Sequence, residues 1–164
     1  MKQIPVDGGK YFALVDDEDF EKLSKYVWYY SGGDIPERSY AIRNFRIGDD
    51  DWTHRRMHRM ILDAKKGEII DHADGNRLNC QRYNIRKCNG RQNMQNQGLS
   101  KNNTSGYKGV RWNKVLHKFQ SQICVNYKNY HLGLFDDKIE AAKAYNEKAK
   151  ELFGEFARLN IIHD

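Results

Sequence analysis

The sequence predicts an α+β protein: a small β-rich N-terminal region, a strand–loop–strand–helix unit, and a C-terminal three-stranded antiparallel sheet packed on one α-helix. Three patterns support this prediction. Short apolar runs flank a loop rich in Gly and Asn between residues 69 and 88. Apolar and polar side chains alternate along residues 118–125, as in a half-buried strand. Apolar side chains recur at helical spacing from Ala141 to Phe153.

The composition is typical of a globular chain rather than a disordered one. Hydrophobic residues make up 39% of the 164 residues and charged residues 30%. No apolar run is long enough to cross a membrane, and the first ten residues lack the apolar core of a signal peptide. The three cysteines show no CxxC spacing, so we expect a cytoplasmic protein without a disulfide framework or a structural zinc.

Charge is distributed unevenly along the chain, whose net charge is +6. Residues 1–51 carry a net charge of −4, residues 52–97 carry +6 and residues 98–164 carry +4. Positive charge concentrated in this way attracts polyanions such as nucleic acids. A basic surface also keeps proteins soluble, so charge alone leaves both interpretations open.

The N-terminal region is expected to alternate strand and helix. Phe20, Leu23 and Val27 lie at helical spacing after an acidic run, and Trp28 and Tyr40 are expected in the core rather than stacked on bases. The expected elements are a strand at 10–15, a helix beginning at 16–19, a turn at 31–34 and an extended piece at 39–47.

Residues 52–68 join this region to the central unit and show helical spacing, with Met57, Met60, Ile61 and Ala64 on one face. Residues 54 and 58 are both His, and two His four positions apart on a helix can bind zinc. No third ligand has a clear position. We therefore expect residue 58 to pack near the active site or to contact a phosphate.

Four polar residues in the central unit have the chemistry of a phosphodiesterase site. Asp71 and His72 are adjacent, Asn84 follows in the loop, and Asn93 lies in the helix start. Carboxylate and amide oxygens are hard ligands suited to Mg²⁺, and a neutral imidazole beside them can take a proton from water. A solvated hairpin turn has a similar composition, but it requires neither Asn93 nor the many basic residues around the loop.

These residues resemble the H-N-H motif of the homing-endonuclease family, in the variant whose last position is Asn. The resemblance implies a ββα-metal finger at about 68–97 within a nuclease domain at 1–97. It implies His72 as general base, Asp71 and Asn93 as ligands of one divalent cation (Mg²⁺, with Mn²⁺ also suitable), and Asn84 as a brace for the loop. The β-rich N-terminal region looks like the lead-in of some family members.

A linker at 98–104 and a second domain at 105–164 are expected to follow. Strands are expected at 107–112, 118–125 and 130–134, and then a helix that ends at Gly154. The alternation in the middle strand leaves one sheet face polar, and amides and guanidinium groups on such a face can read base edges in a DNA groove.

SGYKGVRW and HLGLFDDKIEAAKAYNEKAKELFGEFARLN resemble the plant ethylene-response-factor (APETALA-type) DNA-binding domain. Asn129 and His131 replace the Arg or Trp of plant members, so the target sequence is not transferable. The resemblance implies DNA contacts by Lys108, Arg111, Asn113, Gln120, Gln122 and His131. To these we add the basic side chains of Arg77, Arg86, Arg91 and Lys118.

Together these features predict a site-specific, homing-type endonuclease that acts on double-stranded DNA as a monomer or a DNA-induced dimer. The usual setting of the family implies a phage-encoded or intron-encoded protein without a small-molecule cofactor. Two alternatives remain: a DNA-binding regulator with an inactive finger, and a non-specific defence nuclease.

Overall fold

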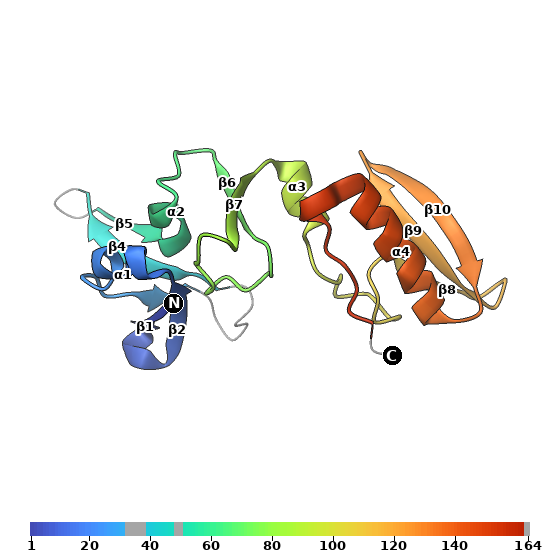
Figure 1. Cartoon of the computed structure of the whole chain (residues 1–164), viewed down its shortest axis with the longest axis horizontal. Helices are drawn as coiled ribbons and strands as arrows, with labels where there is room; N and C mark the ends of the chain where they lie inside the picture. The colour runs from blue at the N-terminus through green and yellow to red at the C-terminus, as the bar shows by residue number, and fades with distance from the viewer. Residues whose placement is uncertain (32–38, 48–50, 163–164) are drawn as a thin grey trace. The chain divides into compact units, whose positions relative to one another are not determined.

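The structure is a computed structural model and describes residues 1–31, 39–47 and 51–162, so most of the predicted turn at 31–34 lies outside the described residues. The chain forms two compact units, Met1–Asn89 and Gly90–Asp164. The α+β class is confirmed, because short helices accompany several small antiparallel sheets (Figure 1). The predicted linker at 98–104 lies within the second unit.

The first unit is built from hairpins and short helices. A hairpin of β1 and β2 is followed by α1, by a sheet of order β3-β4-β5, by α2 and by the β6–β7 hairpin. The elements are β1 Lys2–Val6, β2 Tyr11–Val15, α1 Asp17–Leu23, β3 Tyr29–Tyr30, β4 Ala41–Arg46, β5 Trp52–Arg56, α2 Met57–Ile61, β6 Ile69–His72 and β7 Ile85–Cys88.

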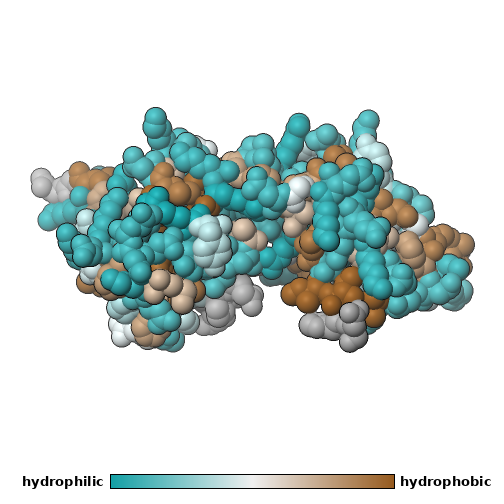
Figure 2. All heavy atoms as spheres, in the orientation of Figure 1, coloured by the Kyte–Doolittle hydropathy of each residue, from teal (hydrophilic) through white to brown (hydrophobic). Residues whose placement is uncertain are grey.

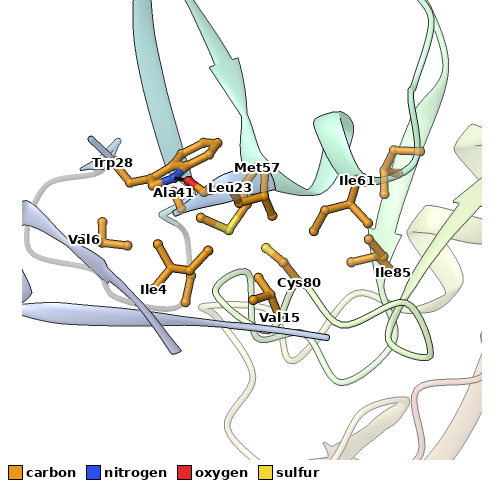
Figure 3. Close-up of a cluster of buried hydrophobic side chains, with 12 residues drawn as sticks. Ile4, Val6, Val15, Leu23, Trp28, Ala41, Met57, Ile61, Cys80 and Ile85 are labelled. Atoms are coloured by element: carbon orange, nitrogen blue, oxygen red, sulfur yellow. Dashed lines mark hydrogen bonds between the residues drawn. The ribbon is translucent and has the colours of Figure 1, made fainter. Parts of the chain in front are cut away.

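One apolar core holds these elements together. Trp28 is 1% exposed, as predicted, and its indole N–H donates to the carbonyl of Leu23 at 2.9 Å, so its polar atom is satisfied. Figure 3 shows Met57 and Cys80 between the side chains of the N-terminal hairpin and Ile85 of β7. The same core therefore supports both the N-terminal sheets and the β6–β7 hairpin.

The second unit is a sheet backed by one long helix. The sheet order is β10-β9-β8, and Ser121 and Ile123 of β9 are buried beneath α4, as the alternation predicted. Ala141, Ala142 and Ala149 are fully buried, which lets the helix lie close to the sheet. The elements are α3 Gly90–Gln95, β8 Val110–Asn113, β9 Lys118–Val125, β10 Lys128–Phe135 and α4 Lys138–Phe153.

The structure corrects two expectations in the first unit and adds one strand. Residues 53–56 form strand β5 rather than a helix, because their backbone pairs with β4 from Phe45 to Ile42. Helix α1 ends at Leu23, and Val27 is 69% exposed rather than part of an apolar helical face. No element was predicted at residues 2–6, where strand β1 pairs with β2, and Pro5 is tolerated in this two-stranded hairpin.

The surface of the described residues is largely polar. Figure 2 shows mostly hydrophilic residues on the face in view, with smaller hydrophobic patches. None of the described helices is long and apolar enough to span a membrane. Cys80, Cys88 and Cys124 are all free thiols.

Candidate active site

Asp71 and His72 end strand β6 and are both buried, with 6% and 5% exposure. In the antiparallel hairpin, Asp71 lies opposite Arg86 and His72 lies opposite Ile85. Successive strand residues point to opposite faces, so the two side chains leave β6 in different directions. The strand thus buries an adjacent carboxylate and imidazole in the first unit, on opposite faces of the hairpin.

Asn84 ties the loop after His72 back to the hairpin. Its side-chain N–H groups donate to Asp74 Oδ1 at 2.9 Å and to the carbonyl of Asn79 at 2.7 Å. Its Oδ1 accepts the backbone N–H of Asp74 at 2.9 Å, and its carbonyl accepts that of Ala73 at 2.8 Å. With 1% exposure, Asn84 has the contacts expected of a loop brace.

Two rings lie against the ring of His72. The ring of His58, from α2, lies edge-on to the His72 ring with centroids 4.8 Å apart. Tyr40 contacts both rings, at 5.0 Å from His58 and 6.0 Å from His72. The guanidinium groups of Arg56 and Arg77 each lie 4.6 Å from the centre of the Tyr40 ring. Half-buried Tyr40, which the sequence predicted in the core, instead borders the candidate site.

Burial sets the protonation state of the two imidazoles. It lowers the pKa of His72 to about 4, although Asp74 and Asp71 act in the opposite direction. Burial likewise lowers the pKa of His58 to about 2, and the charges of His72, Arg56, Arg59 and Arg77 add to that effect. Both rings are therefore neutral near pH 7, and a neutral imidazole can accept a proton.

Asp71 forms an ion pair within the hairpin. Arg86 donates from Nη2 to Asp71 Oδ2 at 2.9 Å and from Nε to the same oxygen at 3.1 Å. The side chain of Arg86 is only 17% exposed. The predicted contact of Arg86 with DNA stays a prediction, and its observed contacts orient Asp71. The cross-strand register, which the sequence does not specify, creates this pair.

Asp71, His72 and Asn84 thus all belong to the β6–β7 hairpin and its loop in the first unit, while Asn93 lies on α3, in the second unit. That Asn93 and Asp71 bind the same divalent cation stays a prediction. Arg91 is exposed on the same helix, and Arg77 lies at Tyr40. Residue 54 lies on β5 and residue 58 on α2, so these two His do not share a helix as the zinc alternative required.

Part of the predicted reading face forms a row across the sheet. Arg111 on β8 donates from Nη2 to Gln120 Oε1 on β9 at 3.1 Å. Gln120 Nε2 lies 3.3 Å from Nδ1 of His131 on β10. Gln122, two residues after Gln120 on β9, is half-buried and lies opposite His131. Arginine, amide and imidazole groups therefore adjoin one another on this face.

Three other residues that were predicted to contact DNA have partners within the chain, and their DNA contacts stay predictions. Lys108 donates from Nζ to the carbonyls of Gln95 and Gln97, each at 2.6 Å, and burial lowers its pKa to about 8. Asn113 Oδ1 accepts the backbone N–H groups of the following turn. Lys118 forms an ion pair with Asp136 at 3.2 Å. Lys108 therefore secures the end of α3, a role that its position in the GYKGVRW motif did not indicate.

Known proteins resemble this chain over most of its length. It is 31% identical over 154 residues to an uncharacterized HNH endonuclease of Acanthamoeba polyphaga mimivirus, a match covering 92% of this chain and 75% of that protein. It is 33% identical over 108 residues to Protein 3.8 of Escherichia phage T7, a match covering 63% of this chain and 88% of that protein. No family model and no solved structure matches the chain. The chain belongs to the HNH endonuclease family.

Proposed function

We propose that this protein is a site-specific, homing-type DNA endonuclease that hydrolyses phosphodiester bonds with His72 as general base. The observation that carries the proposal is the buried, neutral imidazole next to Asp71 at the end of β6, followed by a loop that Asn84 fixes. A buried ring whose orientation is restricted can hold a water in line with a phosphate. The viral origin of both relatives supports a phage-type setting.

The donor set fits one divalent cation. Asp71 would supply a carboxylate oxygen and Asn93 an amide oxygen, the hard ligands that Mg²⁺ or Mn²⁺ prefers. The Arg86 ion pair fixes the orientation of the Asp71 carboxylate, as partners of metal ligands commonly do. When bound, the cation supplies positive charge that stabilises the pentacovalent phosphorus and the departing oxygen.

His72 acts as the proton acceptor. It takes a proton from water as the water oxygen bonds to phosphorus and the bond from phosphorus to the 3′ oxygen breaks. The rings of His58 and Tyr40 restrict the imidazole, and their contacts exclude bulk water from one side. The guanidinium of Arg77, at the Tyr40 ring, is suited to a neighbouring phosphate.

Site selection is assigned to the C-terminal sheet, which resembles the APETALA-type DNA-binding domain. The Arg111–Gln120–His131 row presents donors and acceptors that match base edges in the major groove of double-stranded DNA. Arg111→Ala is expected to relax or weaken site choice while leaving the dependence on divalent ion unchanged. Unchanged cut sites and affinity in that variant would contradict this assignment.

The direct test is incubation of the full chain with a random-sequence duplex library and Mg²⁺, followed by sequencing of both ends of every product. We expect cuts at a restricted set of sequences, and none when EDTA replaces the ion. Cuts without sequence preference would instead identify a non-specific nuclease. Sequence-selective binding without cuts, with Mg²⁺ or Mn²⁺, would identify an inactive regulator.

A further inference from the structure

A basic groove in the first unit takes no part in the proposed mechanism. It has a volume of ≈ 510 Å³ and runs from the end of α1 along β5 to the segment after α2. Asp63 is the single carboxylate among its lining residues. The basic residues that line it are Lys22, Arg43, His54, Arg55, Arg56, Arg59 and Lys66.

The pairing of β4 with β5 concentrates positive charge in this groove. Arg43 and Arg55 lie directly opposite each other in the antiparallel ladder. Like charges in such a pair destabilise a sheet unless an anion lies between or above them. The guanidinium of Arg43 lies 3.8 Å from the centre of the Tyr26 ring, which positions its cationic edge. The arrangement is therefore suited to successive phosphates.

An aromatic hollow adjoins the basic groove. Its volume is ≈ 440 Å³, and it shares Tyr26 and Arg43 with the groove. Tyr29 and Trp52 also line it, with 45% and 68% exposure. Exposed rings that line a hollow offer flat faces on which a base can stack. Phosphate-binding and base-binding chemistry are thus adjacent in the same unit.

The groove also leads toward the candidate active site. Arg56 lines the groove, and its guanidinium lies 4.6 Å from the centre of the Tyr40 ring. That ring is in turn 6.0 Å from the ring of His72. A strand lying in the groove would therefore contact Arg56, whose guanidinium lies at the ring beside the proposed general base.

We propose that this groove binds an unpaired DNA strand, with phosphates along Arg43 and Arg55 and a base stacked on Trp52 or Tyr29. Bases in an intact duplex are stacked on one another and cannot lie flat on these rings, so the occupant is a strand opened near the cut. The inference rests on the proposed nuclease function and adds a second nucleic-acid site to the C-terminal sheet.

The test measures binding without cleavage. Full-length protein in EDTA is titrated with a fluorescein-labelled oligothymidylate and with a hairpin duplex of equal phosphate number, and anisotropy reports the affinity. Trp52→Ala should weaken single-strand binding about ten-fold, with much less effect on the duplex. The logarithm of affinity falls linearly as the logarithm of salt concentration rises. Arg55→Gln should make this slope less steep by about 0.7 for the single strand.

Two matched variants separate the groove from the rest of the surface. Phe12 is an exposed aromatic of β2, and Lys25 is an exposed cation just beyond α1; neither lines the groove or the hollow. Phe12→Ala and Lys25→Gln should bind like the parent protein. Equal losses in groove and control variants, or equal losses for single strand and duplex, would overturn the inference.

The outcomes also distinguish this inference from the proposed function. If the parent protein cuts duplex DNA and Trp52→Ala still binds single strands normally, the nuclease function holds and the groove assignment is wrong. If single-strand binding depends on Trp52 and Arg55 but the protein never cuts DNA with divalent ion, the groove assignment holds and the proposed nuclease function is wrong.

Discussion

At the residue scale, the site depends on side chains that hold other side chains in place. The carboxylate of Asp71 is 6% exposed and receives two hydrogen bonds from Arg86, so its direction is fixed before any ligand binds. Asn84 does the same for the loop that follows His72. Such partners commonly change ligand affinity or turnover although they touch no substrate.

Arg86→Gln is therefore expected to raise the Mg²⁺ concentration needed for half-maximal cleavage by about 10- to 100-fold. The reason is that an unrestrained Asp71 carboxylate must be ordered by the ion itself. Cleavage rates of a plasmid target across a Mg²⁺ titration measure this directly.

Lys87→Gln is the matched control for this variant. Lys87 is the next residue on β7, and its Nζ lies 2.9 Å from Glu68 Oε1 in a largely exposed ion pair. Its loss should leave the Mg²⁺ titration unchanged. If both variants shift the titration equally, general loss of positive charge explains the effect, and Arg86 has no special role.

At the element scale, close approach of helix to sheet defines the second unit. Gly109 has φ +77°, and a Cβ there would meet the Tyr145 ring of α4 and lie 2.7 Å from the carbonyl oxygen of Gln122. Gly106 has φ +81° but no atom within 4 Å of such a Cβ. The two glycines therefore separate backbone strain from steric overlap.

Gly109→Ala is expected to lower the free energy of unfolding of the second unit by about 3 kcal/mol, because strain and overpacking add. Gly106→Ala should cost only about 1 kcal/mol, the strain of the left-handed backbone. Urea unfolding of the full chain, followed by tryptophan fluorescence, measures both. Equal losses in the two variants would contradict the close packing of α4 on the sheet.

Elements with local signals were predictable from the sequence. Strands β6, β7 and β9 and helix α4 lie where alternation, helical spacing and turn residues placed them. Strand β5 was not predictable, because its residues have helical spacing and only the distant partner β4 makes them extended. Long-range pairing overrides local preference in such segments.

The same distinction applies to the site. The Asp71–His72 pair and Asn84 were identifiable because their residue types and spacing carry the chemistry. The Asp71–Arg86 ion pair depends on strand register across a long loop, which the sequence leaves open. The Tyr40–His58–His72 cluster joins three separate elements. Lys108 had the identity expected of a DNA contact, and only the position of α3 assigns it to backbone carbonyls.

At the scale of the whole molecule, the buried imidazoles connect the candidate site to stability. The folded-state pKa values of His58 and His72, about 2 and about 4, lie below the ordinary value of 6.5. The unfolded chain therefore binds protons that the folded chain does not. The stability due to these neutral rings is present above pH 6.5 and is lost as pH falls, toward about 4 for His72 and about 2 for His58.

Each of the two His should remove about 1.4 kcal/mol from the free energy of unfolding per pH unit below about 6.5. Urea unfolding of the full chain between about pH 6.5 and pH 5 measures this, since most carboxyl groups titrate lower. His58→Gln should halve the slope of the free energy of unfolding against pH. A free energy that stays constant over this range would contradict the burial of both rings.

The central claim is that His72 performs the chemical step and contributes little to DNA binding. The most direct measurement compares His72→Ala with the parent protein in two assays, Mg²⁺-dependent cleavage of a plasmid target and gel-shift affinity for the same DNA. For His72→Ala we expect a cleavage rate at least about 100-fold lower with nearly unchanged affinity. Equal loss of cleavage and affinity, or unchanged cleavage, would contradict it.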